Sequence, residues 1–248
     1  MNFSLEPANN PAFRTSFSKM PLTEIKEQAY KNHSSNEFLD SLVPVSTSPI
    51  HLVTHLPSDL RGQGLIDLAN TYQRGGSSCV SMNGSNKSQL NEMKSLSEAT
   101  DISILREDPL TDEYQIWESR IYGAHSFVLM PKMLDQTELQ FYIETGRETG
   151  MEAVVLCESQ TCLEVALATD AKIIAISAGL QSKRELKKLT QHLIKHSGGR
   201  IAVYASEIYS RYDVENIAQK GYKACMINNA PAGGEDLEMA IRTLALKA

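Results

Sequence analysis

The feature that most constrains the fold is a regular alternation of short apolar runs and amphipathic helical patterns, from about residue 50 to the end of the chain. Consecutive parallel strands need a crossover helix between them, and eight such strand–helix units close into a barrel. We therefore expect an α/β fold made of one (β/α)8 barrel. The expected strands are Ile50–Val53, Cys79–Met82, Ile102–Leu105, Phe127–Met130, Ala153–Cys157, Ile173–Ile176, Ile201–Tyr204 and Ala224–Ile227. The expected helices are Gly64–Arg74, Lys87–Ala99, Asp112–Tyr122, Gln136–Thr149, Gln160–Ala168, Ser182–Lys195, Arg211–Lys220 and Gly234–Leu246.

The first part of the chain does not follow this alternation. Residues 1–20 have no helical or strand pattern, whereas Pro21–Ala29 and Ser34–Leu42 are typical of helices that have no counterpart later. We expect an N-terminal extension, residues 1–48, whose helices lie over the barrel mouth, followed by the barrel at residues 49–248.

Composition narrows the function classes. The formal net charge of −6 argues against non-specific nucleic-acid binding and against an anionic membrane surface. No apolar run approaches the roughly 18 residues that cross a bilayer, and the N-terminus lacks the basic-then-apolar order of a signal peptide. We expect a cytoplasmic protein that contacts neither nucleic acid nor membrane.

The four cysteines, Cys79, Cys157, Cys162 and Cys225, lack the spacing of a zinc site. Three of them fall in apolar, strand-like runs, which favours buried thiols in a reducing compartment. His192 and His196 are four residues apart on an expected helix, but no third ligand is near them in sequence. We expect neither a metal nor a cofactor.

A charged triplet marks the centre of the chain. The apolar run Ile102–Leu105 is closed by Arg106, Glu107 and Asp108 and then by Pro109. In α/β barrels the carboxyl ends of the strands carry the chemistry. The triplet is therefore expected at the functional end of the barrel.

The segments around this triplet resemble a known family. Asp112-Glu113-Tyr114-Gln115-Ile116-Trp117-Glu118-Ser119-Arg120 followed by Gly123-Ala124 resembles the D-x-Y-Q-I-x-E-A-R-x-x-G-A-D segment of indole-3-glycerol phosphate synthases, which are TIM barrels of the tryptophan pathway. Leu105–Asp108 resembles the family's L-R-K-D, and Gly150–Val155 its G-M-E-x-L-V. The resemblance covers roughly residues 50 to 245, and the N-terminal helices suit the family's lid. Phosphoribosylanthranilate isomerase, or another phosphate-binding barrel, is the next-best relative.

The resemblance also identifies departures from the family's catalytic residues. The family's lysine general acid on the third strand is replaced by Glu107, which inverts the charge. On the first strand the family's E-x-K becomes His51-Leu52-Val53, and the glycine that helps bind phosphate after the seventh strand becomes Glu207. Further departures are Leu156 for a glutamate, Ser177 for an asparagine, Gly179 for an arginine, and Asn228-Asn229-Ala230 for G-[ES]-[SA]. Authentic synthase activity is therefore not expected.

Polar residues near the expected carboxyl ends of the strands are the candidates for a replacement activity. We expect catalytic roles for His51, Glu107, Ser206 and Glu207, with His51 and Glu107 as a possible acid–base pair. The expected substrate-binding residues are Arg106, Asp108, Lys132, Ser177, Tyr204, Asn228 and Asn229. His55 and Glu158 belong to the same expected face. The alternative for each of them is a drifted position on a solvated barrel mouth.

Three function classes stay open. The first, which we favour, is a repurposed enzyme that acts on another small molecule at the barrel mouth, with a specialised biosynthetic pathway as one setting for such a reaction. The second is a non-catalytic barrel that binds a ligand, a protein partner or a second copy. The third is residual synthase activity, a carbon–carbon lyase reaction. A closed polar pocket favours the first class, and a filled mouth favours the second.

Overall fold

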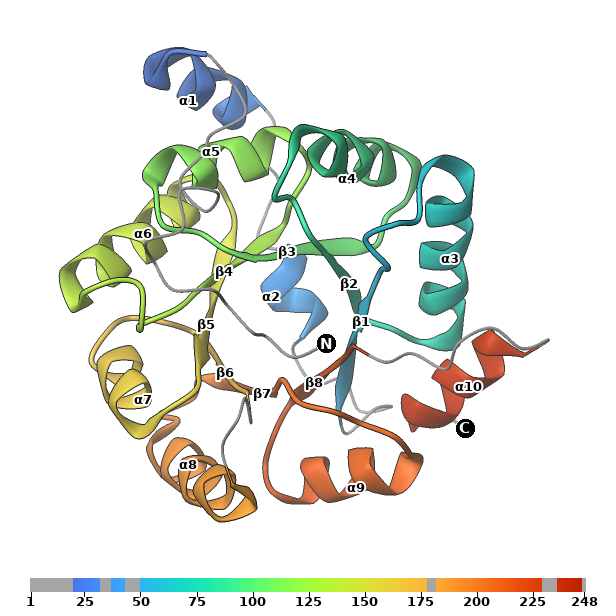
Figure 1. Ribbon diagram of the computed structural model, residues 1–248, viewed down its shortest axis with the longest axis vertical. Helices are drawn as coiled ribbons and strands as arrows, with labels where there is room; N and C mark the ends of the chain where they lie inside the picture. Colours follow the sequence, from blue (N-terminus) through green and yellow to red (C-terminus); the bar gives the residue numbers. More distant parts are fainter. Residues whose placement is uncertain (1–19, 32–36, 43–49, 178–181, 229–235, 247–248) are drawn as a thin grey trace.

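The computed structural model contains a closed barrel of eight parallel strands in sequence order, with β8 beside β1 (Figure 1). The structure describes residues 20–31, 37–42, 50–177, 182–228 and 236–246. The strands are β1 His51–His55, β2 Cys79–Met82, β3 Ser103–Pro109, β4 Ser126–Leu129, β5 Glu152–Cys157, β6 Ile173–Ile176, β7 Ile201–Tyr204 and β8 Ala224–Ile227.

Helices form a ring around these strands (Figure 1). They are α3 Gly62–Gly75, α4 Lys87–Ala99, α5 Glu113–Ile121, α6 Gln136–Glu148, α7 Gln160–Leu167, α8 Lys183–His196, α9 Arg211–Gln219 and α10 Leu237–Leu244. The predicted (β/α)8 fold is thus confirmed. At the start of α8 the Ser182 side chain accepts a hydrogen bond from the backbone N–H of Glu185, and the Glu185 side chain accepts one from the backbone N–H of Ser182.

Two strands extend further than the sequence predicts. β1 ends at His55 rather than Val53, and β3 ends at Pro109 rather than Leu105. Polar residues after an apolar run are typical of a strand end. Here they remain inside the sheet because His55 and Glu107 pair with each other, as Arg106 does with Asp108.

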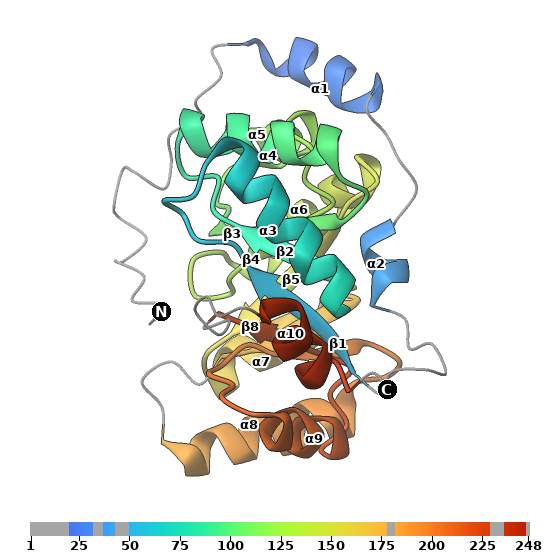
Figure 2. The ribbon, with the colours of Figure 1, turned by 90° about the vertical axis from the view of Figure 1, so that its right-hand side faces the viewer.

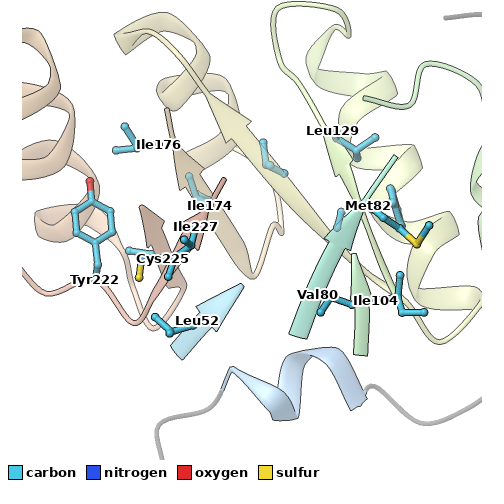
Figure 3. Packing of buried hydrophobic residues seen from close by; sticks show 14 of the residues in the cluster. Leu52, Val80, Met82, Ile104, Leu129, Ile174, Ile176, Tyr222, Cys225 and Ile227 are labelled. Atoms are coloured by element: carbon cyan, nitrogen blue, oxygen red, sulfur yellow. The ribbon is translucent and has the colours of Figure 1, made fainter. Parts of the chain in front are cut away.

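Alternation along the strands separates two apolar layers. Leu52, Val80 and Ile104 belong to the layer between strands and helices, part of which is shown in Figure 3. Val53 and Leu105 belong to the layer inside the barrel. Because neighbours on a strand face opposite sides, this parity tells which side chains enter the interior.

The two N-terminal helices lie in different places. The helix α1, Leu22–Lys31, packs on the outer side of α5, where Ile25 and Ala29 are buried against Trp117 (Figure 2). Lys26 also pairs with Glu113 of α5, 2.6 Å from Nζ to Oε1. Thus α1 is fastened to the rim of the helical ring.

The short helix α2, Glu37–Ser41, instead appears at the centre of the ring in Figure 1, and Figure 2 shows it on the side where β1 begins. It therefore covers the amino end of the strands rather than the mouth, over which we expected it. Phe38 of α2 and Leu42, the first residue after this helix, are buried in the apolar cluster inside the barrel, and α2 contacts β3. The division of the chain at residue 48 stays a prediction.

The predicted burial of the cysteines is confirmed. All four thiols are free and buried. Burial raises the pKa of the Cys225 thiol to about 12, because a thiolate is costly in apolar surroundings. Within the described ranges, no helix combines the length and the apolar character needed to cross a membrane.

Candidate functional site

A buried histidine–carboxylate pair lies at the carboxyl ends of the first strands. His55, the last residue of β1, has its Nδ1 2.9 Å from Oε2 of Glu107 on β3. Only 8% of His55 and 6% of Glu107 is exposed. A carboxylate only accepts, so Nδ1 carries the hydrogen and, in a neutral ring, Nε2 is the acceptor. This geometry holds an imidazole in one tautomer, as general acid–base chemistry requires.

Ser81 of β2 lies next to this pair in the sheet. Its Cα is in register with His55 on one side and with Leu105 on the other. Its Oγ is buried and has no hydrogen-bond partner among the described residues. Buried hydroxyls nearly always have a protein, water or ligand partner, so Ser81 joins the candidate site. Sequence reasoning missed it, although it shares the inward parity of Cys79.

Apolar side chains surround the pair. Met130, Leu156 and Met226 belong to the cluster inside the barrel. In such surroundings a hydrogen bond is electrostatically stronger than in water, and an unpaired polar group is more costly. The environment therefore favours keeping His55 and Glu107 together.

His51 does not lie where the sequence predicts. It is the first residue of β1, and its backbone N–H donates to the Lys223 carbonyl, 2.9 Å away, at the amino end of the barrel. Its Nδ1 lies 2.8 Å from Ser78 Oγ. The predicted His51–Glu107 pair is not formed, because β1 begins at His51 and runs on to His55, which takes its place.

Arg106 and Asp108 face away from the interior. The Nη2 and Nε atoms of Arg106 donate to Oδ2 of Asp108 at 2.8 and 3.0 Å, and only 1% of Arg106 is exposed. Arg106 Nη1 also donates to Ser119 Oγ of α5, 3.0 Å away. A ligand-binding role inside the barrel, which we expected for both, does not fit this placement.

Lys132 and Glu158 form an ion pair beyond the ends of β4 and β5. Lys132 Nζ lies 2.6 Å from Oε2 of Glu158. The expected cation of the mouth is therefore offset by a carboxylate. Ser177 is buried directly after β6, where its backbone N–H donates to the Cys157 carbonyl. Asn228 is half-buried after β8, whereas Asn229 and Gly179 lie outside the described residues.

The seventh strand contributes less than expected. Tyr204 packs edge-on against Tyr222, with ring centroids 5.5 Å apart, in the layer outside the barrel. Burial raises the pKa of the Tyr204 phenol, and a hydrogen bond with Ser206 opposes this shift. Glu207 is exposed and accepts from the Tyr209 hydroxyl at 2.6 Å. These contacts of Tyr204, Ser206 and Glu207 are thus with residues other than His55 and Glu107.

The histidines of α8 lie on an outer helix. The rings of His192 and His196 are 4.4 Å apart, and His192 Nδ1 is 3.2 Å from Nε2 of Gln160. Among the residues that the structure describes, no three histidine, cysteine or acidic side chains are grouped as a metal site would need.

Solved structures with a similar fold are enzymes of other kinds. The 3-hexulose-6-phosphate synthase from Salmonella typhimurium superposes with a TM-score of 0.62 at 15% identity, covering 79% of this chain and 97% of that one. The thiamine phosphate pyrophosphorylase from Pyrococcus furiosus gives 0.59 at 15% identity, covering 80% and 95%. At this identity the likeness concerns the fold alone.

Sequence relatives are closer and agree on one family. An indole-3-glycerol phosphate synthase from Arthrobacter sp. is 32% identical over 174 residues, 66% of this chain and 62% of the relative. Those from Dehalococcoides mccartyi and Desulfosudis oleivorans are 28% identical over 192 residues (72% of each chain) and 25% identical over 239 (91% of each). The family model described as indole-3-glycerol phosphate synthase matches residues 16–244. The chain therefore belongs to the indole-3-glycerol phosphate synthase family.

Proposed function

We propose that this chain is a repurposed member of its family that acts on a small molecule other than the synthase substrate. The observation that carries the proposal is the buried hydrogen bond between His55 and Glu107. It lies where the resemblance places the lysine general acid of the synthases. The site has thus exchanged a cationic acid for a histidine–glutamate pair.

Synthase chemistry is not supported by the residues present. Loss of one general acid typically lowers a rate by about 10² to 10⁴. The second lysine implied by the resemblance is Val53, which is buried in the apolar interior. Neither position offers the ammonium group that the family's reaction uses.

The replacement chemistry is proton transfer. Glu107 holds the Nδ1–H of His55, so Nε2 is the nitrogen that takes a proton from a bound molecule or returns one. The carboxylate stabilises the imidazolium formed on the way. The pair therefore suits a reaction in which a small molecule loses a proton at one atom and gains one at another.

Charge favours a neutral or cationic ligand. A phosphate dianion about 4 Å from Glu107 would be repelled by roughly 4 kcal/mol per unit charge at an effective dielectric near 20. Lys132, which would oppose this repulsion, is already paired with Glu158. Lys132 therefore adds no surplus positive charge for a phosphorylated substrate among the described residues of the mouth.

A non-catalytic barrel is the second candidate. Met130, Leu156 and Met226, near the carboxyl ends of their strands, are buried in the interior cluster, so apolar side chains occupy the mouth end of the barrel. A mouth filled in this way suits a protein that binds a partner rather than a substrate.

One screen separates these possibilities. Thermal unfolding is measured with inorganic phosphate, sulfate and ribose 5-phosphate, and with a panel of amines and uncharged aromatics. We expect stabilisation only within the second group, its loss in His55→Gln, and its retention in His192→Gln. Stabilisation by phosphate, or growth of a tryptophan auxotroph that lacks the synthase, would contradict the proposal. If no member of the panel stabilises the wild type, the non-catalytic candidate replaces it.

A further inference from the structure

We propose that Arg106 and Asp108 are positioning residues that hold Glu107 against His55. The inference rests on the proposed function, in which this pair carries the chemistry. It explains why two charged residues are buried behind the strand rather than exposed at the mouth.

The sheet itself does not fix Glu107 fully. Arg106 is the last residue of β3 in register with β2, opposite Met82. Towards β4 the register jumps from Arg106–Phe127 to Pro109–Val128, so Glu107 and Asp108 bulge out of the ladder. The residue that meets His55 therefore lies where strand pairing is interrupted.

Side chains replace the missing ladder. Arg106 Nη2 donates to the Gly84 carbonyl at 2.9 Å, while the Gly84 N–H donates to Oδ1 of Asp108 at 2.5 Å. The backbone carbonyl and N–H of Gly84, which follows β2, are thus both hydrogen-bonded by the residues on either side of Glu107. Since neighbours on a strand alternate, fixing Arg106 and Asp108 outward directs Glu107 inward.

The contact between Arg106 and Gly84 requires an arginine at the first position and a glycine at the second. A Cβ added to Gly84 would lie 2.8 Å from Nε of Arg106, so a side chain there displaces the guanidinium. The guanidinium bonds Asp108, Gly84 and Ser119 at once. A lysine ammonium cannot donate the same set of hydrogen bonds, because it lacks the planar group of five N–H donors that a guanidinium has. We call the Arg106–Asp108–Gly84 contact the latch.

Burial of an ion pair is weak evidence for a stabilising role, because desolvation offsets the attraction. Conformational specificity is the better reason for the latch. Its predicted effect is therefore on the geometry of the His55–Glu107 hydrogen bond, beyond any effect on the free energy of unfolding.

The tautomer of His55 reports that geometry. Imidazole ¹⁵N chemical shifts, measured in mildly alkaline buffer on the full chain, distinguish Nδ1–H from Nε2–H. Glu107 favours the Nδ1–H form in the wild type, because the bond made by one ring nitrogen sets which nitrogen is protonated. We expect Glu107→Leu to abolish this preference. Arg106→Lys and Asp108→Asn should each lose at least half of it.

The matched control breaks an ion pair elsewhere. Arg147→Lys weakens the contact to the buried Glu152 at the amino end of β5 and should leave the His55 tautomer unchanged. If Glu107→Leu has no effect, the pair and the proposed function fail together. If Glu107→Leu acts but both latch variants keep the wild-type tautomer, only the positioning role is refuted. Should the latch variants not fold, Gly84→Ala displaces the guanidinium more mildly and decides in the same way.

Discussion

The imidazole of His55 and the carboxylate of Glu107 meet 2.9 Å apart although their strands are not neighbours in the sheet. The contact spans β2, whose Ser81 lies in register with His55. Among the described residues, this is the side-chain hydrogen bond found for both His55 and Glu107, so removing either side chain leaves the other without that partner. Their coupling is the most direct quantity to measure.

A double-mutant cycle should reveal this coupling. Glu107→Leu leaves a buried imidazole without its acceptor and should lower the free energy of unfolding by about 2–4 kcal/mol. His55→Leu combined with Glu107→Leu should cost less than the sum of the single changes, because no polar group is left unpaired. Urea denaturation of the four proteins gives the interaction energy. Strict additivity would show that the two side chains do not interact.

Ser81→Ala should leave stability unchanged or raise it by up to about 1–2 kcal/mol, because it removes a buried hydroxyl that has no partner in the described structure. Ser126→Ala is the matched control. The Ser126 Oγ donates to the Glu152 carbonyl at 2.6 Å, so its loss should cost about 1 kcal/mol. Equal destabilisation by both changes in urea would mean that Ser81 has an acceptor of its own.

Restoring one lysine should not restore synthase activity. In Glu107→Lys the ammonium returns to the third strand, but Val53 still occupies the position of the second lysine. Growth of an auxotroph lacking the synthase is the measurement, with a functional synthase gene as the positive control. Colonies carrying Glu107→Lys would show that the barrel has kept the rest of the machinery.

Acid should destabilise the protein through His125. Burial, and secondarily the charge of Arg120, lowers the pKa of His125 to about 4, while Nδ1 accepts from the backbone N–H of Ile104 at 3.2 Å. The unfolded chain, with an ordinary histidine pKa near 6.5, binds the proton first. Stability from this group is therefore complete above about pH 6.5 and is lost as the pH falls towards 4, by roughly 3 kcal/mol.

The control for this pH dependence is a variant that keeps the acceptor. His125→Asn retains an oxygen near the Ile104 N–H but does not titrate, so its stability should fall less between about pH 6.5 and 4. His196→Asn, at an exposed position on α8, should behave like the wild type. Parallel curves for His125→Asn and the wild type would exclude His125 as the source.

The docking of α1 can be followed by fluorescence, because Trp117 is the single tryptophan of the chain. Ala29 is fully buried beside it, so Ala29→Glu should detach α1 and shift the emission to longer wavelength as water reaches the indole. Lys31→Glu, on the exposed side of the same helix, should leave the spectrum unchanged. An unshifted spectrum for Ala29→Glu would show that α1 does not cover Trp117.

The sequence predicts the barrel well because the alternation of apolar runs and helices is a local signal. It does not predict where β1 ends, since the burial of His55 depends on a carboxylate 52 residues away. His51 and His55 also have the same parity on the strand. Only the register of the closed sheet decides which of the two histidines meets Glu107.

The charged triplet shows the same limit. Its central residue, Glu107, lies near the carboxyl end of β3, as the apolar run before it predicts, whereas its functional role stays a prediction. That Arg106 and Asp108 lie outside the barrel depends on Gly84 and Ser119, which are distant in sequence. Charge in a sequence suggests solvent, whereas here long-range partners make burial possible.

The latch has a consequence for how such a barrel changes over evolutionary time. Its hydrogen bonds join Arg106, Asp108 and Gly84 on the outer side of the strand and do not involve the side chain at position 107. Whatever side chain stands there is presented to the interior in the same direction. A single codon change can therefore replace an acid by a base without rebuilding its support, and a new reaction can be tried on an inherited scaffold.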